Sequence, residues 1–272
     1  MSIMVRRLWQ ALLDRVWPGA MRERTQQVWE RYVRGTAVGR VHFGSLRRLH
    51  PIGEVFGVKR GQSVDLCIDR YYIAAFLARH AADIHGHVLE IADDTYTRRF
   101  GADRVQCADV LHALPGNPAA TIVADLTSAT NVPSGRFDCI ILTQTLQYIY
   151  DVRAALRTVH RLLKPGGVVL ATVPGISQTS RYDAEQWGEF WRFTTQSARR
   201  LFGEVFPAHG TAIQGYGNVL VALAFLHGLL IEELRQEELD YHDPDYELLI
   251  TIRAQKPSAA PETASCSSNS GP

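Results

Sequence analysis

Residues 136–175 carry the strongest structural signal in this chain, and they read RFDCIILTQTLQYIYDVRAALRTVHRLLKPGGVVLATVPG. Apolar residues run from 137 to 143 and again from 167 to 173, and between them residues 152–163 place apolar side chains at helical spacing. The turn at 164–166, Lys-Pro-Gly, ends that helix. A lysine suits the negative helix end, a proline prevents continuation, and a glycine adopts positive φ. The stretch therefore predicts a strand–helix–strand unit.

The same alternation of strands and helices continues on both sides of this unit. It predicts an α/β fold, a doubly wound and mostly parallel sheet with helices on both faces. The last two predicted strands flank a long helix, which sets them apart from the others. The strands are predicted at 87–92, 104–108, 120–124, 137–143, 167–173, 209–215 and 246–254, and the helices at 68–84, 152–163, 195–206 and 218–239.

Composition limits the class of protein. The chain has 272 residues, 46% of them hydrophobic, which suits one globular domain with extensions. A net charge of +1 predicts no general affinity for nucleic acid. The charge is unevenly spread, however. The first 50 residues hold ten arginines and three acids, a net +7, whereas residues 232–247 hold eight acids and one arginine, a net −7.

Cysteine spacing and hydropathy predict a cytoplasmic location. The four cysteines lie far apart and form no C-x-x-C pair, so we expect reduced thiols and no metal site. The first residues make a poor signal peptide, because Gln10, Asp14 and Arg15 interrupt the apolar run. The most apolar later stretch, 219–231, is 13 residues long, which is too short to span a bilayer and predicts a buried helix.

The flanks of the predicted domain, residues 65–256, differ from it in composition. Residues 1–64 predict a helical extension with an amphipathic helix at 5–17, a second helix at 22–34, and a glycine-rich linker or lid at 35–61. The basic helices suit either an anionic membrane surface or a protein surface such as the acidic segment, and we favour packing on protein. The tail, 257–272, is rich in Pro, Ser and Ala and predicts disorder.

Candidate ligand contacts follow from the sheet, because ligands bind at the carboxyl ends of parallel strands. Asp109 follows the second predicted strand, where a carboxylate accepts two ribose hydroxyls, and Asp125 follows the third, where it accepts from an exocyclic amine. His85 and His87 fall at the opposite, amino end and are expected to be structural. The residues at the carboxyl ends are Glu90 to Thr95, Asp109, Asp125, Leu126, Thr143, Gln144, Pro174 and Gly175.

The order of these residues resembles the class I S-adenosylmethionine-dependent methyltransferases. Residues 136–175 carry the most specific likeness, and WRFTTQSARRLFGEVF (191–206) resembles the next element of that family. The chain also resembles methyltransferase modules found beside bacterial glycosyltransferases, on the "DRYYI" helix and "WRFT". The resemblance covers about residues 65–256. It implies a Rossmann-like seven-stranded sheet with an antiparallel last strand, S-adenosyl-L-methionine as cofactor, and O-methylation of a small-molecule or glycan acceptor.

The first loop departs from the family pattern of acid-x-Gly-x-Gly. Glu90 matches the acid, but Ala92 and Asp94 stand where the glycines belong. Two interpretations follow: a cofactor site that tolerates the exchange, or a methyltransferase-like fold without catalysis that serves as a binding or scaffold module. The cofactor-binding residues that the resemblance implies are Glu90, Ala92, Asp93, Asp109, Asp125, Leu126, Thr143 and Gln144.

Acceptor contacts are expected after the fourth and fifth strands. Aromatic rings stack on sugars, and Asp or Arg bonds hydroxyls. We expect Asp183 to act as general base. The alternative for Trp187 and Trp191, at i and i+4, is that both only pack a helix onto the domain. No metal is expected. The predicted acceptor-binding residues are Tyr148, Tyr182, Trp187, Trp191 and Arg192.

Overall fold

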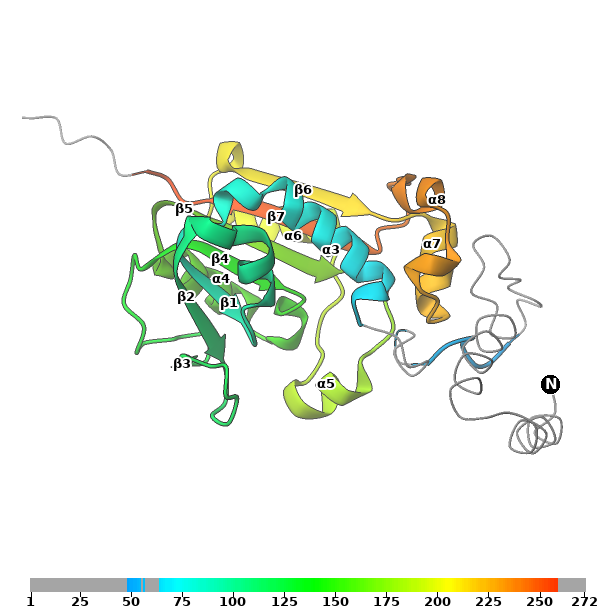
Figure 1. The fold of residues 1–272 in the computed structure, drawn as a ribbon, viewed down its shortest axis with the longest axis horizontal. Coiled ribbons are helices and arrows are strands. Elements are labelled where there is room, and N and C mark those ends of the chain that lie inside the picture. The colour runs from blue at the N-terminus through cyan, green and yellow to red at the C-terminus, as the bar shows by residue number, and fades with distance from the viewer. Residues whose placement is uncertain (1–47, 55, 57–63, 259–272) are drawn as a thin grey trace, which may run out of the picture.

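The computed structural model describes residues 48–54, 56 and 64–258, and they form one seven-stranded sheet. The strand order is β3-β2-β1-β4-β5-β7-β6 (Figure 1). Strands β1 to β5 are parallel to one another, and β7 is antiparallel to both β5 and β6. The predicted fold class is confirmed, including the antiparallel last strand. The bounds are β1 Gly86–Ile91, β2 Val105–His112, β3 Ile122–Val123, β4 Phe137–Thr143, β5 Leu163–Pro174, β6 Thr211–Tyr216 and β7 Leu249–Gln255.

Helices occupy the connections. A π-helical turn, Thr97–Gly101, follows β1. Short 3-10 turns lie at Val64–Leu66, Ala81–Asp83, Ala102–Arg104, Leu146–Tyr148, Ala208–Gly210 and Ile231–Glu233. The α-helices are α3 Ile68–Arg79, α4 Val152–Leu162, α5 Arg181–Trp187, α6 Thr195–Gly203, α7 Val219–Leu226 and α8 Gln236–Asp240.

The sheet is buried on both faces, as its continuous apolar strands predict. Helices α4 and α6 cover one face, where Leu156 and Phe202 belong to the same apolar cluster as Ile140. Helix α3 covers the other face and α7 packs against α3, and Phe225 of α7 belongs to the same cluster as Ile141. Burial of each such side chain contributes about 1.5–3 kcal/mol. The helices leave the carboxyl edge of the sheet to the loops and to α5 (Figure 1).

Several predicted boundaries are wrong. Helix α3 ends at Arg79 and not at 84, and β5 begins at Leu163 and not at 167. Strand β2 continues to His112, four residues beyond its predicted end at 108. The single helix predicted at 218–239 is three pieces, α7, a 3-10 turn and α8. The break falls at Gly228, whose φ of 64° no α-helix contains.

The predicted helices at 5–17 and 22–34 lie outside the described residues, as do most of the 35–61 linker and residues 259–272 of the tail. Among the helices that the structure describes, none has both the length and the apolar character that crossing a bilayer requires.

Candidate functional site

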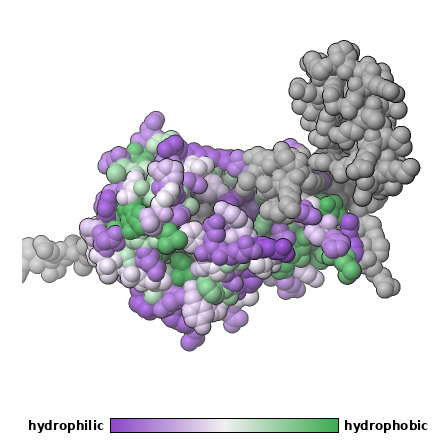
Figure 2. Space-filling view, turned by 90° about the horizontal axis from the view of Figure 1, so that it is seen from below, coloured by the Kyte–Doolittle hydropathy of each residue, from purple (hydrophilic) through white to green (hydrophobic). Residues whose placement is uncertain are grey.

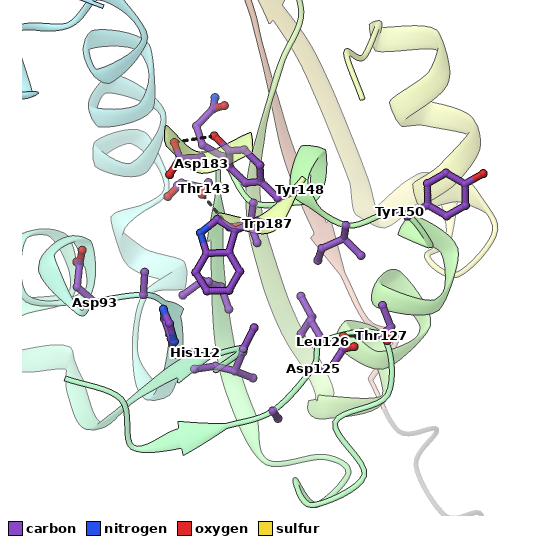
Figure 3. Close-up of a pocket in the computed structure, with 18 of the residues that line it drawn as sticks. Asp93, His112, Asp125, Leu126, Thr127, Thr143, Tyr148, Tyr150, Asp183 and Trp187 are labelled. Atoms are coloured by element: carbon purple, nitrogen blue, oxygen red, sulfur yellow. Dashed lines mark hydrogen bonds between the residues drawn. The ribbon is translucent and has the colours of Figure 1, made fainter. Parts of the chain in front are cut away.

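A cavity of about 700 Å³ opens at the carboxyl edge of the sheet, where the parallel strands predict a ligand site. Its walls come from the residues that end or follow β1, β2, β3 and β4, and α5 contributes from the opposite side (Figure 3). Six of the eight predicted cofactor-binding residues line this cavity: Ala92, Asp93, Asp125, Leu126, Thr143 and Gln144.

The loop after β1 keeps a glycine-like backbone without glycine. Ala92 has φ of 74°, a conformation that costs an L-residue on the order of 1–2 kcal/mol. The Ala92 amide donates to the carbonyl of Leu111 at 3.0 Å, and its carbonyl accepts from Asn117 Nδ2 at 2.7 Å. Asp94 turns its carboxylate to Arg98 at 2.7 Å. The loop therefore presents the Ala92 backbone and Asp93 to the cavity, while Asp94 pairs with the following turn.

Glu90 supports this loop from behind and does not line the cavity. It is 3% exposed, and its two oxygens accept from the amides of Tyr96 at 3.1 Å and Thr97 at 2.7 Å. Burial raises the pKa of the Glu90 carboxyl to about 7, although these hydrogen bonds lower it in part. The structure therefore gives Glu90 the role of fixing the Tyr96–Thr97 backbone.

Asp109 lies inside β2 and away from the cavity, which corrects its prediction as a ribose contact. It is 7% exposed and sits in a network with Arg136 Nη2 at 2.6 Å, His87 Nε2 at 2.7 Å and Thr121 Oγ1 at 2.6 Å. Burial alone would raise the pKa of Asp109, but the bonds from Thr121, His87 and Arg136 outweigh it and lower that pKa. His87 is structural, as its place at the amino end predicted.

His112 occupies the end of β2 and lines the cavity. Its Nδ1 lies 2.6 Å from the carbonyl of Leu114. The tautomer that donates from Nδ1 to this carbonyl leaves Nε2 as an acceptor. The imidazole stands edge-to-face with Trp187, with ring centroids 5.4 Å apart. Sequence reasoning missed His112, although its place just before the Pro115-Gly116 turn marks a strand end.

An apolar slot with one polar end lies between β1, β2 and β3. Ile91, Leu111 and Ala124 line it, and Leu126 is buried beneath. Asp125 closes the slot, and its Oδ1 accepts from the amide of Thr127 at 2.8 Å. This combination suits a flat heteroaromatic ring that carries a donor at its edge.

Tyr148 and Asp183 meet on the side of the cavity beside α5 (Figure 3). The Tyr148 hydroxyl donates to Asp183 Oδ2 at 3.2 Å, and Ser180 Oγ donates to the same oxygen at 2.6 Å. Burial raises the pKa of Tyr148, and the Asp183 charge adds to this, so the phenol stays protonated. Trp187 of α5 lines the cavity beside this pair.

Three predicted acceptor-binding residues lie outside the cavity lining. Tyr182 is 69% exposed. Trp191 Nε1 donates to the carbonyl of Ile149 at 3.1 Å, and Arg192 pairs with Glu189 at 2.7 Å. The alternative of one helix carrying Trp187 and Trp191 is also wrong, since α5 ends at Trp187.

Charge in the cavity is mostly negative. Its lining contains one arginine, Arg70, whose Nη1 donates to the Tyr96 hydroxyl at 2.9 Å. A cavity of this kind suits a cationic or neutral ligand better than an anion. The acids of the lining are Asp93, Asp125, Asp151 and Asp183.

Three potential metal ligands also lie close together, but at the amino end of the sheet. One ligand atom from each of His87, Cys107 and Asp109 falls within 4.8 Å of the other two. Asp109 is already paired with the guanidinium of Arg136, which opposes a cation at that place. The group belongs to the network that holds β1 and β2 together.

The profile of the methyltransferase-domain family matches residues 67–209, more than half of the chain. A curated relative, the ubiquinone/menaquinone biosynthesis C-methyltransferase UbiE of Enterobacter sp. (strain 638), is 30% identical over 161 residues. That match covers 53% of this chain and 61% of the relative, so the chain spans less than two thirds of its relative's length.

Two solved structures are similar to this fold. A SAM-dependent methyltransferase from Archaeoglobus fulgidus has a TM-score of 0.47 at 11% identity, over 69% of this chain and 94% of that one. The N-methyltransferase NodS from Bradyrhizobium japonicum WM9, in complex with S-adenosyl-L-homocysteine, has a TM-score of 0.46 at 15% identity, over 72% and 90%.

Proposed function

Because this chain belongs to the methyltransferase-domain family, we propose that it transfers the methyl group of S-adenosyl-L-methionine to a hydroxyl of a small-molecule or glycan acceptor. The observation that carries the proposal is the cavity at the carboxyl edge of the sheet, with an apolar slot on one side and a tyrosine–aspartate pair on the other.

The cofactor half is the side built by β1, β2 and β3. The slot between Ile91, Leu111 and Leu126 suits adenine, and Asp125 suits its exocyclic amine. His112 Nε2 offers one acceptor to a ribose hydroxyl. The Ala92 loop brings bare backbone to the cavity, and Asp93 suits the ammonium of the methionine moiety. An acidic lining also suits a ligand whose sulfonium is positive.

When bound, the cofactor would supply a methyl group activated by its positive sulfur: an oxygen–carbon bond would form as the carbon–sulfur bond breaks, with S-adenosyl-L-homocysteine as the leaving group. What the chain has to provide is alignment, exclusion of water and removal of the hydroxyl proton. Trp187 and Tyr148 flank the acceptor side and restrict water there.

Asp183 is the proposed general base. Its Oδ2 accepts from Tyr148 and Ser180, which fixes the orientation of the carboxylate. The acceptor hydroxyl gives its proton to this carboxylate as the oxygen–methyl bond forms. Trp187 offers an aromatic face to a sugar ring.

Calorimetry with S-adenosyl-L-methionine and S-adenosyl-L-homocysteine tests the cofactor. We expect saturable binding of both ligands to the full chain. Absence of heat with either ligand at millimolar concentration, together with an unchanged melting temperature, would contradict the proposal. It would favour the alternative of a methyltransferase-like binding or scaffold module.

Methyl transfer is tested with radiolabelled cofactor and a panel of methyl glycosides and other small hydroxyl compounds. For any acceptor that is methylated, Asp183→Asn should lower kcat by 10²–10⁴-fold, as expected for loss of a general base, with unchanged cofactor binding. The matched control is Glu185→Gln, which changes an exposed acid of the same helix outside the cavity lining. Transfer to carbon in the product, found by NMR, would refute O-methylation and leave methyl transfer standing.

A further inference from the structure

Helix α7 exposes an apolar face. Val219, Leu223 and Leu226, spaced four and three residues apart, are 48%, 36% and 37% exposed. This spacing puts them on one side of the helix. The opposite side, which includes Val221 and Phe225, is buried in the apolar cluster that α7 shares with α3. Apolar surface appears in Figure 2 at the end of the molecule that holds α7 and α8 in Figure 1.

An acidic border adjoins this face. Asn218, which caps α7, donates through Nδ2 to the carbonyls of Glu238 at 2.7 Å and Tyr241 at 2.9 Å, and so holds α8 beside the start of α7. The segment 232–247 carries eight acids and one arginine. The exposed acids among them are Glu232, Glu237, Asp240 and Asp245.

The chain enters the described domain at the other end of the same helix. The amide of Gly53 donates to the carbonyl of His227, the C-cap of α7, at 2.7 Å. The ring of Phe56 packs on Phe225 with centroids 5.4 Å apart, and Ile52 packs against the same apolar cluster. Residues that precede position 48 are therefore tethered next to the exposed apolar face.

We propose that residues 5–17 dock on the exposed face of α7. Their sequence places Val5, Leu8 and Leu12 on one helical side, with Arg6 and Arg7 away from it and Arg15 at its edge. The segment carries three arginines and one acid, and this positive charge complements the four exposed acids of the border. The apolar stripe covers Val219, Leu223 and Leu226, and the arginines face the acids around α8.

The tether makes this contact intramolecular. Residues 18–52 connect the docking segment to the anchor at Gly53. The helix predicted at 22–34 alone would be roughly 20 Å long, more than the roughly 12 Å of α7, so the connection is long enough to span it. A connection of this kind gives an effective concentration of about a millimolar. A helix as short as 5–17 is marginal in water by itself, so docking also supplies the tertiary contacts that stabilise it. The same acidic border repels an anionic lipid surface.

Disulfide trapping in the full chain tests the contact. The background variant carries Cys107→Ser and Cys266→Ser, which remove the exposed thiol and the thiol of the tail. Adding Leu12→Cys and Leu223→Cys then places one thiol at the centre of each surface. The control pair is Leu12→Cys with Val123→Cys, an exposed apolar site on β3. We expect a disulfide within one chain that forms at least tenfold faster for the first pair. Matching circular dichroism and melting curves establish that the variants are folded.

Charge provides the second measurement. Glu237→Lys with Asp240→Lys should slow the first pair about tenfold, as should a rise in salt to 1 M, whereas Asp103→Lys elsewhere on the surface should change nothing. Equal rates for the two cysteine pairs would overturn the proposal. So would a disulfide between two chains, which would assign the face to a second copy. Co-sedimentation with phosphatidylglycerol vesicles without the within-chain disulfide would assign the N-terminal segment to a membrane, and would overturn it as well.

Discussion

At Ala92 the backbone adopts a conformation that is unfavourable for any residue except glycine. Its φ of 74° is a glycine conformation, and the surrounding hydrogen bonds of the loop hold it there. Ala92→Gly should therefore stabilise the protein by about 0.5–1 kcal/mol, because relief of the strained φ exceeds the added freedom of the unfolded chain. Urea denaturation measures this difference, and cofactor affinity should be retained or improved.

Ala113→Gly is the matched control for this exchange. Ala113 lines the same cavity but is not among the residues with positive φ. The same substitution should therefore cost about 0.5–1 kcal/mol there. Equal effects at the two positions would show that strain at Ala92 does not determine the result.

Because of Glu90, the free energy of unfolding should depend on pH near neutrality. Its folded pKa of about 7 lies above the unfolded value of 4.5, so the folded state holds the proton more tightly. The free energy of unfolding then falls as pH rises from 4.5 through 7, by at most about 3 kcal/mol from this group. Glu90→Gln removes the charge, so its stability relative to the parent should improve from pH 5 to pH 8 in urea titrations. A difference that stays constant across that range would contradict the shifted pKa.

Asp109 and His112 should separate stability from binding. Asp109→Asn weakens the pairing with Arg136 and His87 and should cost on the order of 1–3 kcal/mol of stability, with cofactor affinity unchanged. His112→Ala should do the reverse, lowering affinity about three- to tenfold with little loss of stability. The dependence of stability on pH below neutrality tests the role of Asp109. Its pKa is lowered, so its contribution is present above the unfolded pKa of about 4 and is lost as pH falls further.

At the scale of elements, α5 is attached to the domain by few contacts. Trp187 meets His112, Asp183 meets Tyr148, and the amide of Phe190 donates to the carbonyl of Gln147 at 2.8 Å. None of its residues is fully buried. We therefore expect the amides of 184–187 to exchange hydrogen much faster than those of β4, and to slow several-fold when S-adenosyl-L-homocysteine fills the cavity beneath. Mass spectrometry of exchanging peptides measures both rates, with α6 as the internal reference.

Most strands and helices could be predicted from the sequence, but some of their ends could not. Periodicity and turn chemistry predicted the strands and the crossover helices, because these features are local and repeated. The antiparallel direction of β7 was predicted by the family resemblance alone. The predicted end of β2 was wrong because contacts between residues distant in sequence determine it. Asp109 was interpreted as a loop residue, yet Arg136 and His87, both distant in sequence, satisfy its charge within the strand. The break of the predicted 218–239 helix had a local signal in Gly228 that was overlooked.

The candidate site was predicted in outline for the same reason. Loop residues after β1, β3 and β4 line the cavity because a parallel sheet brings its carboxyl ends together. The approach of α5, and so the pairing of Trp187 with His112, depends on the path of residues 175–193, which no periodic pattern specifies.

For the whole molecule, bound cofactor should raise stability by mass action. At a ligand concentration one hundred times the Kd, the gain is about 2.7 kcal/mol. For a domain of this size that corresponds to a rise in melting temperature of roughly 5–10 °C. Differential scanning calorimetry with S-adenosyl-L-homocysteine measures it, and His112→Ala should give a smaller rise at the same ligand concentration. An equal rise in both proteins would remove His112 from the site.

The placement of β7 has a consequence for biosynthesis. In sequence β7 is the last strand, but in the sheet it lies between β5 and β6. Among the strands that the structure describes, β6 pairs with β7 alone. A nascent chain from which residues 249–255 are still missing therefore carries β6 without a neighbour and β5 with an open edge. A nonsense codon just before β7 would delete β7 from the sequence, and β6 would leave the sheet with it. The truncated chain would then expose the unpaired edges of β5 and β6, which favours aggregation and degradation.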